Sequence, residues 1–283
     1  MSSRATAVVG LGQMGSGMAR SLVRAGHAVL GVDPGPAPTP EGVERVDLTT
    51  ALTQADVILL SLPGSDHVEQ VLTGEQGLSS LGLPPRLVLD TSTCDPVSTR
   101  THASALADQG HTLVDAPVSG GASGSLAGTL TVFLGCPPEH LERVREVLSP
   151  LAGQINHIGD VGAGHTAKLV NNLLCGIHLA AAREALAIAH SGGIDPARLV
   201  EALNTASGRS AVTEINLPRW VLSDTYDSGF PTALMARDVA LAAHVAQASG
   251  LHTPLADLAA TAWGELRDDL GPETDFNKMV TYE

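Results

Sequence analysis

The chain has 283 residues and a formal charge of −14, with 30 acidic against 16 basic side chains. Such a surface repels phosphate backbones and anionic membranes, and two Trp, two Tyr and three Phe offer few rings for stacking bases. Nucleic acid and a membrane are therefore not expected as partners. Only two of the basic residues are lysines, Lys168 and Lys278. A chain of this length usually folds as more than one domain.

The cysteines and the apolar stretches indicate a cytoplasmic protein. Cys94, Cys136 and Cys175 are odd in number and widely spaced, so they form no disulfide framework and predict a reducing compartment. The first twelve residues lack the long apolar run of a signal peptide. The most apolar stretch, 169–188, contains Asn, His, Arg and Glu, and it is predicted to be a buried helix of a soluble protein.

Short β-branched runs alternate with helical patterns in the first half, which is typical of parallel βαβ units. The predicted strands are 5–9, 28–33, 57–62, 87–90, 112–115 and 130–134, and the last is expected to run antiparallel at an edge because no helical crossover precedes it. The predicted helices between them are 14–24, 48–54, 67–72, 96–108 and 139–148.

The β signal ends after residue 164, and the rest of the chain has helical periodicity. Helices are predicted at about 166–190, 196–205, 212–222, 233–248 and 254–269. The predicted fold class is therefore an α/β Rossmann domain, 1–162, followed by an all-α domain, 163–283. A long helix links the two and is the first element of the second domain.

A glycine-rich turn joins the first strand to the first helix. Gly10 permits a tight turn, Gly12 lets the backbone approach a pyrophosphate, and Gly15 lets the helix pack against the strand. A glycine-rich turn without a ligand is the plain alternative, but its place between strand and helix favours a dinucleotide. The expected cofactor-binding residues here are Gly10, Leu11, Gly12, Gln13, Met14 and Gly15.

The second strand ends at Asp33, 18 residues after Gly15 (33 − 15), where an acidic side chain would bind a ribose 2′-hydroxyl. Residues 34–44 contain no Arg or Lys to meet a 2′-phosphate, although Arg45 could fold back. These residues predict NAD as the cofactor, with NADP the less favoured choice.

Two later strand ends face the same side of the predicted sheet. Leu62 and Pro63 stand at the end of one strand, and the run 90–93 stands at the end of the next. Ligands of open α/β sheets bind beyond the carboxyl ends of the strands, so these residues suit a ribose or a nicotinamide ring. Ordinary loop chemistry is an equally good interpretation from the residues alone.

Ser119, Gly120 and Gly121 follow the strand that ends at Asp115. Consecutive glycines expose backbone N–H groups, and a serine beside them makes a small anion site that suits a substrate carboxylate. A flexible hairpin is the plainer interpretation.

Lys168 and Asn172 stand four residues apart on one face of the predicted long helix. A helix N-terminus and an apolar setting both disfavour an ammonium, so the lysine would exchange a proton near neutral pH. A surface lysine is the alternative. Arginine cannot deprotonate, so a chain that otherwise uses arginine would need a lysine for this role.

Four segments resemble motifs of the β-hydroxyacid dehydrogenase family: GLGQMGSGMA (10–19), DAPVSGGASGSLAGTLT (115–131), GAGHTAKLVNN (162–172) and MARDVALA (235–242). The resemblance covers nearly the whole chain. The last motif departs from the family, which usually has Lys-Asp where this chain has Arg237-Asp238. Charge is kept there, but an arginine has a different geometry.

The resemblance implies roles for particular residues. Lys168 would be the catalytic acid/base and Asn172 its assistant, Ser119 to Gly121 would bind the substrate carboxylate, and Thr93 and Arg237 would contact the cofactor. It also implies a homodimer or homotetramer built through the helical domain. The expected reaction is NAD-dependent interconversion of a small 3-hydroxy or 2-hydroxy acid with its semialdehyde or oxo acid.

Three alternatives remain open at this stage. An imine reductase has a similar fold but usually lacks the lysine, and a non-catalytic NAD sensor would not need the catalytic side chains. A metal centre has little support, because the 11 histidines show no HxxxH or HxH spacing.

Overall fold

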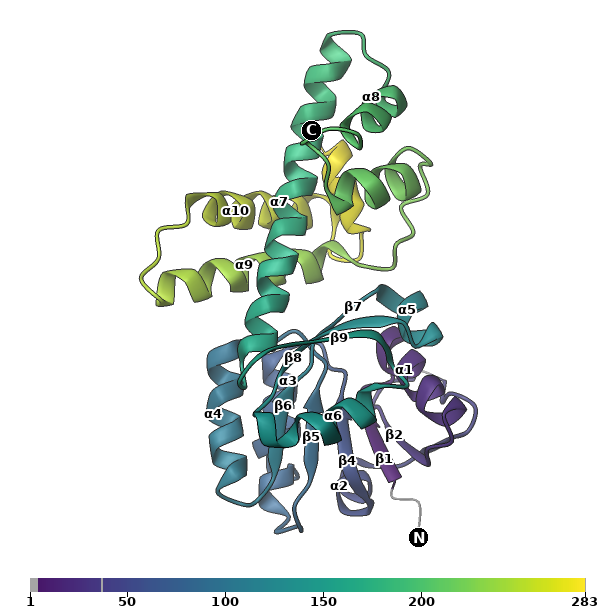
Figure 1. The fold of residues 1–283 in the computed structure, drawn as a ribbon, viewed down its shortest axis with the longest axis vertical. Coiled ribbons are helices and arrows are strands. Elements are labelled where there is room, and N and C mark those ends of the chain that lie inside the picture. Colours follow the sequence, from purple (N-terminus) through teal and green to yellow (C-terminus); the bar gives the residue numbers. More distant parts are fainter. Residues whose placement is uncertain (1–4, 37, 283) are drawn as a thin grey trace. The chain divides into compact units, whose positions relative to one another are not determined.

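The computed structural model describes residues 5–36 and 38–282, and Figure 1 shows its fold. Its N-terminal part is a nine-stranded sheet in the order β3-β2-β1-β4-β5-β6-β8-β7, with β9 pairing with β8. The strands are β1 (Ala5–Val9), β2 (Val29–Val32), β3 (Val43–Arg45), β4 (Ala55–Leu60), β5 (Leu87–Asp90), β6 (Thr112–Asp115), β7 (Val118–Ser119), β8 (Leu130–Gly135) and β9 (Ala152–Gly159).

Strands β1 to β6 are all parallel. Their spatial order is the one in which dinucleotide-binding folds place two mononucleotide halves side by side, and their carboxyl ends share one edge. The predicted Rossmann domain is confirmed.

The far side of the sheet differs from the prediction. Strand β8 is antiparallel to β6, as expected, but it is no edge strand, because β7 and β9 also pair with it. Strands β3, β7 and β9 were not predicted. The first two have three and two residues, and β9 contains Gly, Gln, Asn and His and has mostly exposed side chains, so neither length nor alternation marks it.

Helices cover both faces of this sheet. They are α1 (Gln13–Arg24), α2 (Leu48–Gln54), α3 (Ser65–Thr73), α4 (Pro96–Ala107), α5 (Gly121–Ala127) and α6 (Leu141–Leu148). Successive strand residues point to opposite faces, so Leu59 packs with α1 and α6 while Ile58 and Leu60 pack with α2, α3 and α4. Each fully buried leucine contributes roughly 1.5–3 kcal/mol relative to an exposed one.

Helix α5 was not among the predicted helices. Its glycines and serines are weak helix formers, and its contacts with α1 explain its stability. Ser21 Oγ donates to the Ser125 carbonyl oxygen at 3.0 Å, and a Cβ on Gly17 would lie 2.1 Å from Ser125 Oγ. Tertiary packing has overridden local propensity here.

Helix α7 (Ala163–Ser191) begins in the first of two compact units, Met1–Lys168 and Leu169–Glu283. It starts three residues before the predicted position, which makes Lys168 its sixth residue. We retain the predicted boundary between 162 and 163, where α7 begins, as a proposal.

The described residues of the second unit form helices, as predicted. After α7 come α8 (Pro196–Leu203), the π-helix η3 (Val212–Val221), α9 (Thr232–Ala248), α10 (Pro254–Leu270) and the short 3₁₀ helix η4 (Phe276–Thr281). Trp263 is fully buried and donates from Nε1 to the Gly176 carbonyl oxygen at 3.2 Å. A Cβ on Gly176 would lie 2.9 Å from that ring nitrogen, so glycine permits this close packing.

Helix α7 is long and apolar enough to span a membrane by length and composition alone, although such a signal is weak when a single helix gives it. The sequence predicted a buried helix here, but only 17% of the most apolar 18-residue segment of α7 is buried in this chain. Leu174 and Ile188 are 50% and 73% exposed.

Among the described residues no disulfide joins Cys94, Cys136 or Cys175; the first two are buried and the third is half-buried. Burial, followed by the nearby charges of Glu139, Asp115 and Asp160, raises the pKa of the Cys136 thiol to about 11. This thiol therefore stays protonated and unreactive at neutral pH.

Candidate active site

The glycine turn between β1 and α1 has the geometry that dinucleotide binding requires. Gly10 has φ +96°, and a Cβ there would lie 2.1 Å from the Ser61 carbonyl oxygen, while one on Gly15 would lie 1.8 Å from the Gly10 carbonyl oxygen. Nothing lies within 4 Å of the Cβ position of Gly12. No side chain caps α1 at Gly12. The turn thus offers backbone N–H groups and open space to a pyrophosphate.

Asp33 stands at the end of β2 and contacts this turn directly. Its Oδ2 accepts a hydrogen bond from the Leu11 N–H at 2.7 Å, and its Oδ1 accepts one from the Gly35 N–H at 2.7 Å. Arg45, at the end of β3, does fold back: its Nη2 donates to the carbonyl oxygens of Asp33 and Gly35, both at 2.6 Å. A guanidinium therefore lies against the backbone of Asp33, the residue expected to bind the ribose.

The other predicted strand-end residues lie along the same edge of the sheet, because β2, β1, β4 and β5 are neighbours. The Leu62 N–H, beyond β4, donates to Ser92 Oγ, beyond β5, at 3.0 Å. Pro63 is exposed and Thr93 half-buried in the two turns. The structure thus brings the glycine turn, Asp33 and these two turns together at one edge.

Ser119 ends β7, and two glycines lead from it into α5. Gly120 has φ +130° and Gly121 φ +64°, conformations that side chains disfavour, and both residues are exposed. The segment is a defined strand-to-helix turn rather than a flexible hairpin.

Lys168 and Asn172 lie one turn apart on α7 and are 8% and 5% exposed. Asn172 Nδ2 donates to Asp238 Oδ2 at 2.6 Å, and its Oδ1 accepts from Asn171 Nδ2 at 3.0 Å. The second proton of Nδ2 can still be donated to a substrate oxygen.

Arg237 contacts the same carboxylate. Its Nε and Nη2 donate to Asp238 Oδ1 at 3.0 and 2.6 Å. Asp238, 1% exposed, therefore fixes both Arg237 and Asn172. The motif analysis quoted this aspartate without assigning it a role, although its place beside Arg237 was a usable signal.

Sequence reasoning assigned no role to two buried side chains at the start of α7, Asp115 and His165. Asp115, at the end of β6, accepts hydrogen bonds from the Gly162 N–H at 2.7 Å and the His165 N–H at 2.8 Å. Burial raises the pKa of the Asp115 carboxyl, against the opposing effects of His165 and the two backbone N–H groups.

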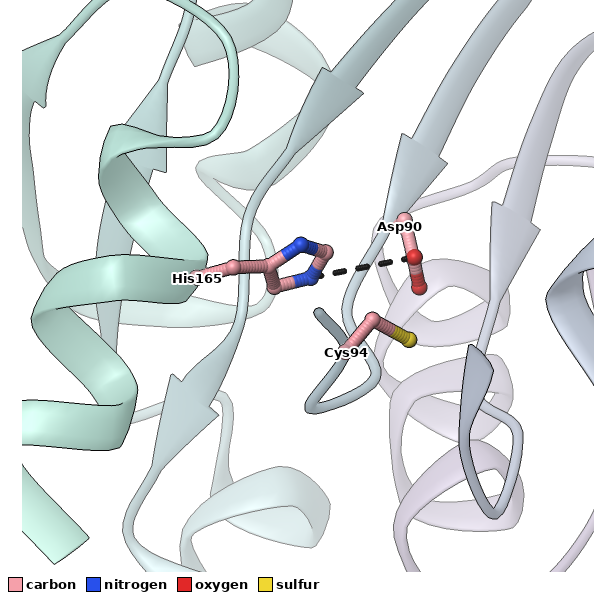
Figure 2. A group of neighbouring side chains, drawn as sticks. All are labelled: Asp90, Cys94 and His165. Carbon is pink, nitrogen blue, oxygen red and sulfur yellow. Dashed lines mark ion pairs between the residues drawn. The ribbon is translucent and has the colours of Figure 1, made fainter. Parts of the chain in front are cut away.

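Asp90, Cys94 and His165 are buried with their potential ligand atoms within 4.8 Å of one another (Figure 2). These residue types could bind zinc. However, His165 Nε2 lies 3.1 Å from the Ser92 carbonyl oxygen and Nδ1 lies 2.8 Å from Thr99 Oγ1. A carbonyl oxygen only accepts, so Nε2 holds a proton and is not a ligand. The geometry favours a hydrogen-bonded cluster over a metal centre.

The fold and the cofactor edge define a nicotinamide-dinucleotide-binding oxidoreductase, and the comparisons with known proteins agree. Residues 5–159 match the family model described as the NAD-binding domain of 6-phosphogluconate dehydrogenase. Residues 162–282 match the NAD-binding domain of NADP-dependent 3-hydroxyisobutyrate dehydrogenase. The protein belongs to the β-hydroxyacid dehydrogenase family, of the 3-hydroxyisobutyrate dehydrogenase type.

Similar proteins cover nearly the same length. A 3-hydroxyisobutyrate dehydrogenase of Pseudomonas aeruginosa is 40% identical, over 89% of each chain. An NAD-dependent L-serine dehydrogenase of the same organism is 35% identical, over 96% of this chain and 95% of its own. A solved Mycobacterium tuberculosis 3-hydroxyisobutyrate dehydrogenase with L-serine is 32% identical and superposes with a TM-score of 0.88, covering 98% of both chains.

Proposed function

We propose that this protein reversibly oxidises a small 3-hydroxy acid with NAD, and that Lys168 is the general acid/base. The observation that carries the proposal is that Lys168 is buried and lies on the same face of α7 as Asn172. Asp238 accepts a hydrogen bond from the Asn172 amide and so holds it in place. Burial favours the uncharged form of a lysine, which can accept a proton.

Each residue has a defined part in this proposal. Lys168 Nζ accepts the proton of the substrate hydroxyl during oxidation and returns it during reduction, while Asn172 Nδ2 donates to the same oxygen. Ser119 Oγ and the N–H groups of Gly120 and Gly121 bind the carboxylate. NAD, held by the glycine turn and Asp33, would supply the acceptor for the hydride that leaves the carbon bearing the hydroxyl.

The cofactor is bound by the carboxyl edge of the sheet in this proposal. The glycine turn, 10–15, receives the pyrophosphate, and Asp33 accepts a hydrogen bond from the ribose. Leu62, Pro63 and Thr93 adjoin the nicotinamide half, and we retain the predicted contact between Arg237 and the cofactor.

The substrates of the similar dehydrogenases share one skeleton. By their names, one acts on 3-hydroxyisobutyrate and another on L-serine. Both compounds have a primary alcohol, a carboxylate two carbons away and a small substituent on the carbon between. We propose this skeleton as the substrate class, which narrows the initial choice between 3-hydroxy and 2-hydroxy acids.

A kinetic panel tests the proposed function. With NAD, we expect turnover of 3-hydroxyisobutyrate, L-serine or glycerate, which have this skeleton, and little turnover of a 2-hydroxy acid that lacks a 3-hydroxyl. Turnover of cyclic imines but no hydroxy acid would favour the imine reductase alternative. Cofactor binding without turnover of any compound would favour the NAD sensor.

Ser119→Ala is expected to raise KM for the hydroxy acid by about ten- to a hundredfold, because a hydrogen bond to a charged group contributes roughly 1.5–3 kcal/mol. KM for NAD should not change. Ser149→Ala is the matched control, since its hydroxyl donates to the Glu146 carbonyl oxygen at 3.0 Å at the exposed end of α6. Initial-rate kinetics with each substrate varied in turn give both constants. An unchanged KM for the hydroxy acid would place the carboxylate elsewhere.

We also propose a homodimer or homotetramer formed through the helical unit, in a reducing compartment such as the cytoplasm. Large apolar side chains on this unit support the assembly: Ile188, Leu255 and Leu258 are 73%, 66% and 67% exposed. Exposed apolar groups of this size favour burial against another surface.

A further inference from the structure

We propose that Asp115 and His165 are positioning residues that set the place of Lys168. This inference rests on the proposed role of Lys168 as acid/base. Lys168 is the sixth residue of α7, so its position depends on how the first turn of that helix is held. Both side chains act on that turn, and both are fully buried.

Asp115 supplies the N-terminal cap of α7 from a different element. Val161 and Gly162, which precede the helix, have no side-chain oxygen, and the two oxygens of Asp115 accept from the Gly162 and His165 N–H groups. A cap that lies some 50 residues away in sequence fixes the helix to the end of β6 as well as stabilising it.

Close packing prevents the capped helix from shifting. A Cβ on Gly164 would lie 2.3 Å from the Phe133 carbonyl oxygen, and one on Gly135 would lie 2.3 Å from Asp115 Oδ1. The first turn of α7 thus touches the backbone of β8 while its amides bind β6. Gly164 and Lys168 are four residues apart, so they share a face of the helix.

His165 connects this turn to the carboxyl edge of the sheet, where we propose that the cofactor binds. Its ring donates from Nε2 to the Ser92 carbonyl oxygen and contacts Thr99 Oγ1 through Nδ1. Figure 2 shows the ring directed toward Asp90, whose Oδ2 lies 3.7 Å from Nε2. The turn after β5 contains Ser92 and Thr93, and we expect it to contact the nicotinamide half of the cofactor. The His165 side chain therefore positions α7 relative to this turn.

The geometry therefore assigns these two residues a role beyond stability. Displacing a reacting group by about 1 Å can cost a hundredfold in rate. Loss of either side chain should lower kcat without weakening cofactor binding at the glycine turn.

Three variants test the inference: Asp115→Asn, His165→Ala and His165→Gln. Asparagine keeps one acceptor and loses the other, and glutamine can place an N–H near the position of Nε2. For each variant, kcat is expressed per NADH-binding site, determined by fluorescence titration, so that unfolded protein does not count. We expect kcat to fall by about ten- to a hundredfold in the first two, an NADH dissociation constant close to wild type, and substantial recovery in His165→Gln.

Arg86→Met is the matched control. Arg86 is a buried side chain that joins β5 to α2, donating to the Leu52 and Thr53 carbonyl oxygens at 3.2 and 2.8 Å. Its loss should lower the melting temperature and leave kcat per site unchanged. Equal kcat per site in Asp115→Asn, His165→Ala and this control would overturn the positioning role. Wild-type kcat in Lys168→Met would refute the proposed acid/base, and the inference with it.

Discussion

Lys168→Met is expected to lower kcat by about a thousandfold while NADH still binds normally. General acid/base catalysis contributes roughly 10²–10⁴-fold, and methionine fills a similar volume without a titratable group. Lys168→Arg should be comparably slow in oxidation, because a guanidinium does not release its proton at neutral pH. Stopped-flow and steady-state NADH absorbance give the rates, and fluorescence titration gives NADH affinity.

The other lysine of the chain provides the control. Lys278 lies in η4 with Nζ 3.4 Å from the centre of the Tyr226 ring, a cation–π contact. Lys278→Met makes the same chemical change at the other lysine of the chain, and this variant should keep the wild-type kcat. If Lys168→Met retained more than about a tenth of the wild-type rate, the proton would have another acceptor.

Asp33→Ser is expected to shift the ratio of kcat/KM for NAD over NADP by at least about a hundredfold toward NADP. A carboxylate beside a 2′-phosphate costs several kcal/mol of repulsion. Its removal leaves the positive charge of the Arg45 guanidinium, which donates to the Asp33 and Gly35 carbonyl oxygens, to attract the phosphate. NAD activity should also fall, because the Leu11 N–H loses its carboxylate acceptor.

The double variant Asp33→Ser, Arg45→Ala separates the two effects. It should lose most of the NADP activity gained by Asp33→Ser, since the attracting charge is gone. Arg45→Ala alone should keep NAD preferred, because the repelling carboxylate remains. An unchanged cofactor ratio in Asp33→Ser would show that selectivity lies outside the end of β2.

The central strands and the glycine turn could be predicted because their signals are local. Runs such as Val8-Val9 before Gly10 combine β propensity, burial and a turn within a few residues, and the same holds for the strand that ends at Asp90. The missed elements lack such signals. Helix α5 depends on contact with α1 through Gly17, and β9 depends on pairing with β8, so neighbouring elements determine both.

The site residues, too, fall into those that local spacing identified and those that depend on distant contacts. Gly10, Gly12, Gly15 and Asp33 were identified from spacing, and their geometry fits a dinucleotide. Asp238 was overlooked because its partner Asn172 is 66 residues away, and a sequence pattern does not show which carboxylate meets which amide. The return of Arg45 to the end of β2 was stated only as an open alternative, since a turn of unknown shape separates the two.

By itself, the sequence determined the class of fold, the cofactor turn and the lysine on which the proposed chemistry depends, because periodicity and short motifs are properties of neighbouring residues. Only the tertiary structure decided how α7 is held. Asp115 caps it across 47 and 50 residues, and His165 reaches Thr99 and Ser92 across 66 and 73. Contacts at such separations form only when β6, β5 and α4 have assembled, and no local preference encodes them.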